Sequence, residues 1–361
     1  MANCIIKSVF AIVISVMLFT SCNNNPTQNK SNEKGKINIA AILPLTGNAA
    51  VAGEYSKNGL QLAVEEINAS GGINGSLIDI SYNDSKGDAK EGVNLIMKVN
   101  TGNKPSIIYS QLSGVSLAIK PITEKNNQIL IAVSGAGNLL DSSNHTYRNY
   151  IDPNTFTNIV TKNLKDTFQI QRIGILYANS EFGRSIFNSL SKNMKSQNIE
   201  LSFESQFDEQ SNDYKTVVEK LKQSKVENVY VIGIGKSLGL VYKTLKEYKY
   251  NGRIFGGIES TLPDAKNAVG DLGKGITYFD FAYSAEYNFP GYKSFVEKYK
   301  AKFNSEPAIP VVLAYSAMMS LSKNMSTFSD GGANAKTEGN EFPFVQVENK
   351  NFTHPIKIKT Y

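Results

Sequence analysis

The fold that this sequence predicts is decided by residues 37–84, which read INIAAILPLTGNAAVAGEYSKNGLQLAVEEINASGGINGSLIDISYND. Two short apolar runs, residues 37–45 and 77–82, predict buried strands. Between them, small or apolar residues recur at helical spacing and share one face: Gly59, Leu60, Ala63, Val64 and Ile67. Because strands alternate with helices, the stretch predicts a parallel sheet that is covered on both faces.

The same alternation continues along the chain. Further strands are predicted at residues 106–109, 129–133, 173–177, 201–206, 228–234, 253–257 and 275–281. Segments with helical spacing separate most of them, and two more helices are predicted at residues 290–303 and 310–325. The sequence therefore predicts an α/β fold with two doubly wound, Rossmann-like halves of similar size. By pattern alone, these would be two contiguous domains followed by a helical end.

The first 22 residues have the pattern of a bacterial export signal. Lys7 precedes an apolar run at residues 9–19, which has the length of a signal core and is short for a membrane span. The run ends in LFTSC at residues 18–22, which resembles a lipobox, although Phe19 stands where Leu is usual. We therefore expect removal of residues 1–21 as a signal peptide and lipidation of Cys22. An ordinary cleaved signal with an incidental cysteine is the alternative.

Composition limits what the mature chain can do. Residues 22–35 are polar without an apolar pattern and predict a flexible, lipid-anchored tether. Since Cys4 lies in the leader, Cys22 would be the one cysteine left, which excludes an internal disulfide and a thiolate metal cluster. No apolar run of about 18 residues follows the leader, so no transmembrane helix is predicted there. The net charge of +6 comes from scattered lysines, which argues against a nucleic-acid partner.

The opening resembles that of the branched-chain amino-acid (Leu/Ile/Val) binding proteins, through ILPLTG at residues 42–47 and NGLQLAVEEINASGGINGSLIDISYND at residues 58–84. These are type I periplasmic solute-binding proteins, which deliver ligands to ABC importers. The resemblance extends from about residue 37 to about residue 321. It implies two lobes that are joined by three crossovers: residues 36–152 and 283–340 in lobe 1, and residues 153–282 and 341–361 in lobe 2.

The chain departs from the family near its end. Residues 330–340 are rich in Gly and Asn, where family members usually have a longer segment with Gly and aromatic residues. Beyond this segment, residues 344–347 and 355–359 still predict a closing hairpin. The contraction would change contacts between the lobes or with a partner.

Two turns of lobe 1 are candidates for ligand binding. Ligands bind beyond the carboxyl ends of the strands in open parallel sheets, where the free N–H groups at helix starts attract anions. The resemblance implies that these turns hold the α-carboxylate of a bound amino acid, through Ser113 or Gly114 in the first and through Gly135 and Ala136 in the second. Gly137 stands where the family usually has Thr or Ser, which removes one hydroxyl donor. Without the resemblance, both segments are plain strand-to-helix turns.

Lobe 2 supplies the remaining candidates. By resemblance, Glu259 holds the place of the acidic residue that binds the ligand ammonium, and a carboxylate in a closing cleft needs such a cationic partner. Phe182 matches an aromatic residue beside the ligand. Ile234 and Gly235 stand where the family often has an aromatic wall, so a reshaped pocket is expected. The alternatives are a solvated loop glutamate and a core phenylalanine.

Signals for an enzyme are poor. The two histidines, His145 and His354, have no ligand-like spacing, and the sequence contains neither a G-x-S-x-G elbow nor a P-loop. Asp84 and Asp88 follow a strand, but Asp88 fits the N-cap of the next helix better than a metal site. We therefore expect no catalytic residue, metal or cofactor.

Together these features predict an exported, lipid-anchored solute-binding protein that faces the periplasm or the cell exterior. Its ligand would be a small polar molecule, an amino acid or related amide, bound between the lobes. Its partners would be the membrane subunits of an ABC importer and, through the anchor, a bacterial membrane. A ligand-sensing receptor of the same fold is the alternative.

Overall fold

The computed structural model describes the following residues of the chain: 35–102, 104–281, 291–332, 334, 347–352 and 356–360. For the last of these stretches it describes the backbone alone. The expected signal peptide, Cys22 and the tether therefore lie outside the described residues, as does most of the segment 330–340. Among the helices that are described, none has both the length and the apolar composition that crossing a membrane requires.

The first sheet contains five parallel strands in the spatial order β2-β1-β3-β4-β5. Their bounds are Ile37–Leu43 (β1), Ile78–Asp84 (β2), Ile107–Gln111 (β3), Ile129–Val133 (β4) and Thr146–Arg148 (β5). Every residue of β3 is buried, as expected for a central parallel strand that is covered on both faces. The strand order reverses between β1 and β3, and this switch point is where such sheets bind ligands.

The second sheet repeats this arrangement with the order β7-β6-β8-β9-β10. Its strands are Arg172–Ala178 (β6), Glu200–Phe207 (β7), Asn228–Ile232 (β8), Arg253–Gly256 (β9) and Thr277–Phe281 (β10). Its switch point lies between β6 and β8. The prediction of an α/β fold with two doubly wound parallel sheets is thereby confirmed.

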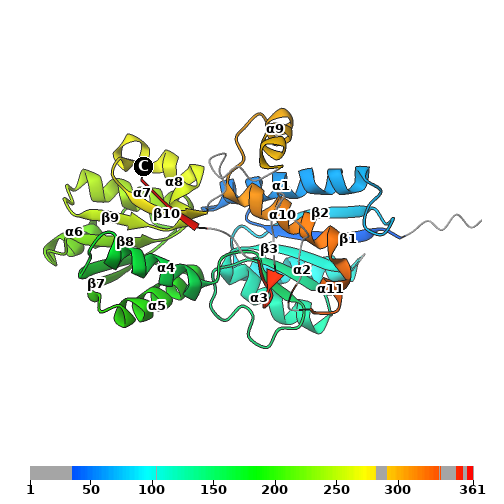
Figure 1. The fold of residues 1–361 in the computed structure, drawn as a ribbon, viewed down its shortest axis with the longest axis horizontal. Coiled ribbons are helices and arrows are strands. Elements are labelled where there is room, and N and C mark those ends of the chain that lie inside the picture. The colour runs from blue at the N-terminus through cyan, green and yellow to red at the C-terminus, as the bar shows by residue number, and fades with distance from the viewer. Residues whose placement is uncertain are drawn as a thin grey trace, which may run out of the picture. The chain divides into compact units, whose positions relative to one another are not determined.

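Helices lie on both sides of each sheet (Figure 1). Those from the first half are Ala50–Ala69 (α1), Ala89–Thr101 (α2) and Ser113–Lys125 (α3). Pro153–Asp166 (α4) leads from the first sheet into the second. The helices between the strands of the second sheet are Glu181–Ser196 (α5), Lys215–Gln223 (α6), Gly235–Glu247 (α7) and Pro263–Val269 (α8), with short 3₁₀ turns at Ile258–Thr261 (η1) and Gly270–Gly273 (η2). Three late helices follow: Tyr292–Phe303 (α9), Ile309–Lys323 (α10) and Met325–Ser329 (α11).

The late helices return to the first sheet. In Figure 1, α10 runs beside α1, although the two are far apart in the sequence. Glu66 of α1 binds Lys298 at 2.9 Å and the Tyr315 hydroxyl at 3.1 Å. Gly59 permits this close packing, because a Cβ there would lie 2.4 Å from the Val311 carbonyl oxygen. The chain therefore crosses back to build lobe 1 after it completes the second sheet.

The C-terminal strands divide between the two sheets. Val347–Glu348 (β11) pairs antiparallel with Asn351–Phe352 (β12), which pairs in parallel with β5 of the first sheet. Ile356–Thr360 (β13) instead pairs antiparallel with β10 of the second sheet.

This pairing differs from the expectation in two respects. The tail 341–361 was expected to lie entirely in lobe 2, and residues 344–347 were expected to form a hairpin with residues 355–359. Phe352 supplies a physical reason, because it is fully buried in lobe 1 at 6.0 Å from the Phe328 ring. Burial of this aromatic side chain stabilises β12 beside β5, so β12 forms its hairpin with β11 and β13 pairs with β10 instead.

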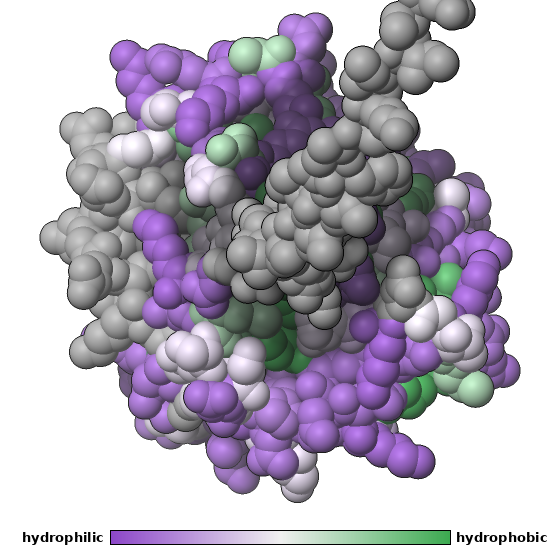
Figure 2. Space-filling view, turned by 90° about the vertical axis from the view of Figure 1, so that its right-hand side faces the viewer, coloured by the Kyte–Doolittle hydropathy of each residue, from purple (hydrophilic) through white to green (hydrophobic). Residues whose placement is uncertain are grey.

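The described surface follows the usual division between polar exterior and apolar core. On the face that Figure 2 shows, the described residues are mostly hydrophilic, and apolar residues appear in small separate areas. The exposed large apolar side chains are scattered over the sequence: Val51, Leu77, Met97 and Leu272. Single exposed residues of this kind are normal and do not by themselves mark a docking surface.

We predict that Gly59→Ala destabilises the protein by about 1–3 kcal/mol, because the added methyl group must push α10 away from α1. Gly114→Ala is the matched control, since a Cβ at Gly114 would contact nothing within 4 Å. Urea denaturation measures both, and equal midpoints for the two variants would contradict the packing argument.

Candidate functional site

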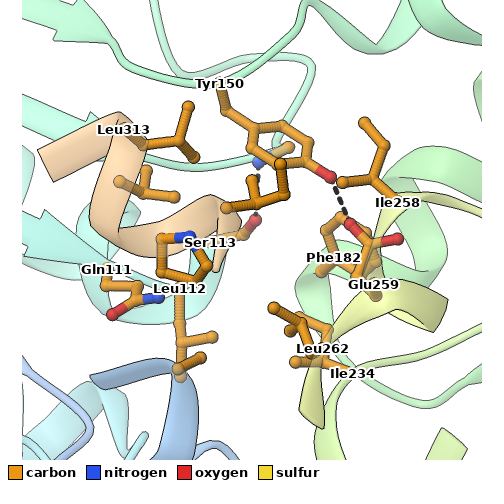
Figure 3. Close-up of a pocket in the computed structure, with 15 residues that line it drawn as sticks. Gln111, Leu112, Ser113, Tyr150, Phe182, Ile234, Ile258, Glu259, Leu262 and Leu313 are labelled. Carbon is orange, nitrogen blue, oxygen red and sulfur yellow. Dashed lines mark hydrogen bonds between the residues drawn. The ribbon is translucent and has the colours of Figure 1, made fainter. Parts of the chain in front are cut away.

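The carboxyl edges of both sheets line one cavity (Figure 3). Its volume is about 60 Å³, several times what one water requires, so it can hold a small solute. The polar groups in its wall are the side chains of Gln111, Ser113, Tyr150 and Glu259. The rest of the wall is mostly aliphatic, and it includes Leu112, Val133, Ile234, Ile258, Leu262, Ile309 and Leu313.

Glu259 is the charged group of this wall. It lies in η1 directly after β9, it is 9% exposed, and its carboxylate accepts a hydrogen bond from the Tyr150 hydroxyl (Figure 3). Burial raises the pKa of Glu259 to about 7, and the bond from Tyr150 opposes this shift. Burial also raises the pKa of Tyr150 well above its usual value, so this hydroxyl stays a donor. None of the described residues that line the cavity is a lysine or arginine, so the carboxylate has no cationic partner there.

Ser113 and Gly135 meet at the opposite side of the cavity. Ser113 begins α3, and its Oγ accepts a hydrogen bond from the Gly135 N–H at 3.1 Å. The two groups that were expected to hold a carboxylate therefore contact each other, while the Ser113 hydroxyl hydrogen and the first N–H groups of α3 remain for a ligand. Gly135 is required here, because a Cβ would lie 2.8 Å from the Phe182 ring of lobe 2.

The turn before α3 is strained. Leu112 has a φ of +78° and a ψ of 134°, a backbone conformation that a residue other than glycine rarely adopts. Such a conformation costs about 1–3 kcal/mol and persists where the surrounding structure holds it in place. Here the Leu112 N–H donates to the Val133 carbonyl, and the side chain lines the cavity. The strain thus falls between the carboxyl end of β3 and Ser113.

Four of the expected site residues line the cavity, namely Ser113, Gly135, Phe182 and Glu259. The other three lie outside its wall. A Cβ at Gly114 would face open space, Ala136 is buried in the core of lobe 1, and the Gly137 N–H donates to Ser185 Oγ of lobe 2 at 2.8 Å. Phe182 packs edge-on against Tyr150 at 6.4 Å between ring centroids.

Several wall residues had no signal in the sequence. Tyr150 lies in the connection between the lobes, where no motif singles it out. Gln111 lies within the turn at residues 110–116 that the sequence singles out, yet no ligand-binding role was expected of it, because a polar residue at a strand end is unremarkable by itself. Ile309, Pro310 and Leu313 come from α10, which reaches the cavity because the late helices return to lobe 1.

A side chain of lobe 1 caps a helix of lobe 2. Asn48, in the loop after β1, accepts a hydrogen bond from the Ser237 N–H at 3.1 Å. Its amide nitrogen donates to the Ile234 carbonyl at 3.0 Å and to Ser237 Oγ at 3.3 Å. Ile234, the N-cap position of α7, has no side-chain group that could bond the helix end, and asparagine is a preferred cap. The contact also holds the backbone of Ile234, whose side chain lines the cavity.

Metal binding has no support among the described residues, where no group of three or more His, Cys, Asp and Glu side chains is suitably placed. His354 lies outside these residues.

The sequence matches a family described as periplasmic binding protein over residues 36–334. Leu/Ile/Val-binding protein homolog 2 of Brucella abortus is 23% identical over 344 residues, covering 86% of this chain and 90% of the relative. The leucine-, isoleucine-, valine-, threonine-, and alanine-binding protein of Pseudomonas aeruginosa is 23% identical over 292 residues, covering 80% of this chain and 78% of the relative.

Solved structures share the fold. The branched-chain amino acid transporter substrate-binding protein LivJ of Streptococcus pneumoniae, in complex with isoleucine, has a TM-score of 0.81 and 21% identity, and the match covers 90% of this chain and 96% of that one. The leucine-binding protein LivK of Thermotoga maritima has a TM-score of 0.83 and 18% identity, with 90% and 95% covered. A solute-binding protein of Rhodopseudomonas palustris, in complex with 3,4-dihydroxybenzoic acid, has a TM-score of 0.77 and 18% identity, with 90% and 93% covered.

We predict that Asn48→Ala lowers the free energy of unfolding by about 1 kcal/mol, because α7 loses the cap that lobe 1 supplies. Asn212→Ala, at an exposed position of lobe 2, is the control and should change stability by less than about 0.5 kcal/mol. Urea denaturation measures the difference. An unchanged midpoint for Asn48→Ala would mean that the cap between the lobes does not form in solution.

Proposed function

Because the chain belongs to the periplasmic binding protein family, we propose that it captures a small amino acid, or a related amide, between its lobes for delivery to an ABC importer. The family consists of solute-binding proteins, so the chain is a binding protein and not an enzyme. The ligand class and the importer are the parts that this proposal adds.

The observation that carries the proposal is that one side of the cavity favours a negatively charged group and the other side a positively charged one. Ser113 and the start of α3 lie on one side, where a helix N-terminus favours negative charge. The buried carboxyl of Glu259 lies on the other side, where the described lining residues include no lysine or arginine (Figure 3). The carboxylate and ammonium groups of an α-amino acid complement these two sides.

The same geometry weighs against other ligands. The R. palustris neighbour is in complex with an aromatic acid, which has no ammonium group. Such an anion would leave Glu259 buried without a counter-charge, and ionised Glu259 would repel it. The isoleucine in LivJ is instead an α-amino acid, and the aliphatic wall here offers apolar surface to the carbon atoms of such a ligand. We therefore favour an amino acid.

The anchor belongs to the proposal as well. LFTSC at residues 18–22, together with the polar tether that follows, supports lipidation at Cys22 and retention on the outer face of a membrane. An anchored binding protein stays near the membrane subunits to which it delivers its ligand.

A thermal-shift screen of the purified protein against amino acids, amides and organic acids tests the ligand class. A ligand at 100-fold excess over its Kd stabilises the folded protein by about 2.7 kcal/mol, which raises the melting temperature by a few degrees. If only organic acids raise it, the amino-acid proposal is refuted.

We predict that Glu259→Gln weakens binding of the amino acid found in this screen by at least ~30-fold, because removal of one partner of a desolvated charge pair costs roughly 2–5 kcal/mol. Glu204→Gln, at an exposed position of β7, is the control and should bind as the parent does. Calorimetry measures both. Parental affinity in Glu259→Gln would show that the ligand ammonium is bound elsewhere.

Binding should also depend on pH through Glu259. The pKa of its carboxyl is raised to about 7 in the free protein, and a ligand ammonium requires the ionised form. Affinity should therefore rise as the pH increases from about 5 towards 7 and level off above that value. Glu259→Gln should lose this dependence, whereas an unchanged slope in the variant would assign the titration to another group.

We further predict that Cys22→Ser releases the protein from the membrane fraction, because serine has no thiol to acylate. Fractionation and labelling with a fatty-acid analogue measure the change. Cys4→Ser, within the expected leader, serves as the control and should remain anchored. Membrane retention of Cys22→Ser that still requires detergent for release would rule out this anchor.

A further inference from the structure

Gln111 is the neutral polar residue in the cavity wall whose role the proposed function leaves open. It is the last residue of β3, its side chain is 5% exposed, and it lies beside Leu112 on the side away from Glu259 (Figure 3). Among the described residues, its Oε1 atom has no hydrogen-bond partner. Nearly all buried polar atoms in native proteins are hydrogen-bonded, and because Gln111 lines the cavity, a ligand bound there can supply a partner for its carboxamide.

The side chain of Gln111 stands in a mostly apolar wall. The lining residues from the first sheet and its covering helices include Ala52, Leu112, Pro310 and Leu313, whose side chains are apolar. The backbone of Gln111 is committed to the sheet, where it pairs with Val133 of β4. An aliphatic residue at this position would make this part of the wall apolar. Glutamine instead places a hydrogen-bond donor and an acceptor there.

We propose that Gln111 is a specificity-determining residue that selects an α-amino acid whose side chain carries a hydroxyl or carboxamide group. This inference rests on the proposed function, because Ser113 and Glu259 must hold the backbone groups of the ligand. The selected side chain is uncharged, since no lysine, arginine or second carboxylate among the described lining residues could balance a charge beside Gln111. It is also short, because the cavity volume is about 60 Å³.

Pairs of ligands with the same shape distinguish recognition by hydrogen bonding from recognition by shape. Threonine and valine have nearly the same shape, as do asparagine and leucine, so within each pair the members differ mainly in hydrogen bonding. A site built to bond a polar group discriminates strongly against the analogue that lacks it, whereas an apolar pocket rejects an added hydroxyl by only about 10²-fold. We expect the wild-type protein to bind the polar member at least tenfold more tightly, in whichever pair the cavity accommodates.

The matching variant is Gln111→Leu, which keeps a similar volume and removes both hydrogen-bonding groups. The variant should bind the polar ligand more weakly and its apolar isostere more tightly, so that the ratio of the two affinities falls by at least tenfold. Gln171→Leu, at an exposed position before β6, is the control and should leave the ratio unchanged. Calorimetry on the lipid-free mature protein gives the four dissociation constants of each pair.

The outcomes separate the two proposals. If the wild-type protein binds valine or leucine as tightly as the polar isosteres, the assignment of Gln111 is overturned while amino-acid binding stands. The assignment is also overturned if Gln111→Leu leaves the ratio unchanged. If none of the four binds while the thermal-shift screen finds another amino acid, the assignment of Gln111 is overturned, and if no amino acid or amide binds at all, the proposed function itself fails. The ratio of dissociation constants within each pair can be measured on the wild-type protein alone, so the test remains decisive even if Gln111→Leu does not fold.

Discussion

Two parallel sheets end at one cavity, and this constraint governs the position of every candidate ligand group. At the carboxyl edge of a parallel sheet the strands give way to turns and helix starts, which carry backbone N–H groups without helical partners. Ser113 follows β3, Phe182 follows β6 and Glu259 follows β9, so all three reach the cavity by the same rule. Among the described residues that line the cavity, none comes from the opposite ends of the strands.

Electrostatics inside the cavity follow from burial. Removing Glu259 from water raises the pKa of its carboxyl to about 7, and a single tyrosine hydroxyl compensates for part of the lost solvation. A cation that enters the cavity restores the ionised form and gains a strong hydrogen bond in return. Under the proposed function, Tyr150 holds the carboxyl in place, and the positive charge that the described lining residues lack would come from the ligand.

Contact between the lobes depends on small residues and on shared backbone groups. Gly135 leaves space for the Phe182 ring, which a methyl group would displace. Asn48 satisfies the free end of α7, and Ser185 accepts the Gly137 N–H. These bonds use backbone groups that water would solvate if the lobes separated, so their net stabilisation is modest and the contact can open. Such weak, specific bonds suit a protein that must both close on a solute and release it.

Local periodicity by itself determined the α/β class, since strand and helix patterns are properties of neighbouring residues. The family resemblance added Ser113, Gly135, Phe182 and Glu259, because these residues match positions that contact the ligand in that family. The tertiary structure alone decided that the Tyr150 hydroxyl hydrogen-bonds to Glu259, 109 residues away. It also decided that Asn48 caps α7 through the N–H of Ser237, 189 residues away. It also divided the C-terminal strands between both sheets, against the expectation of a single lobe. Contacts of this kind arise when distant segments bury apolar surface together, and no local pattern encodes which distant partner a side chain meets.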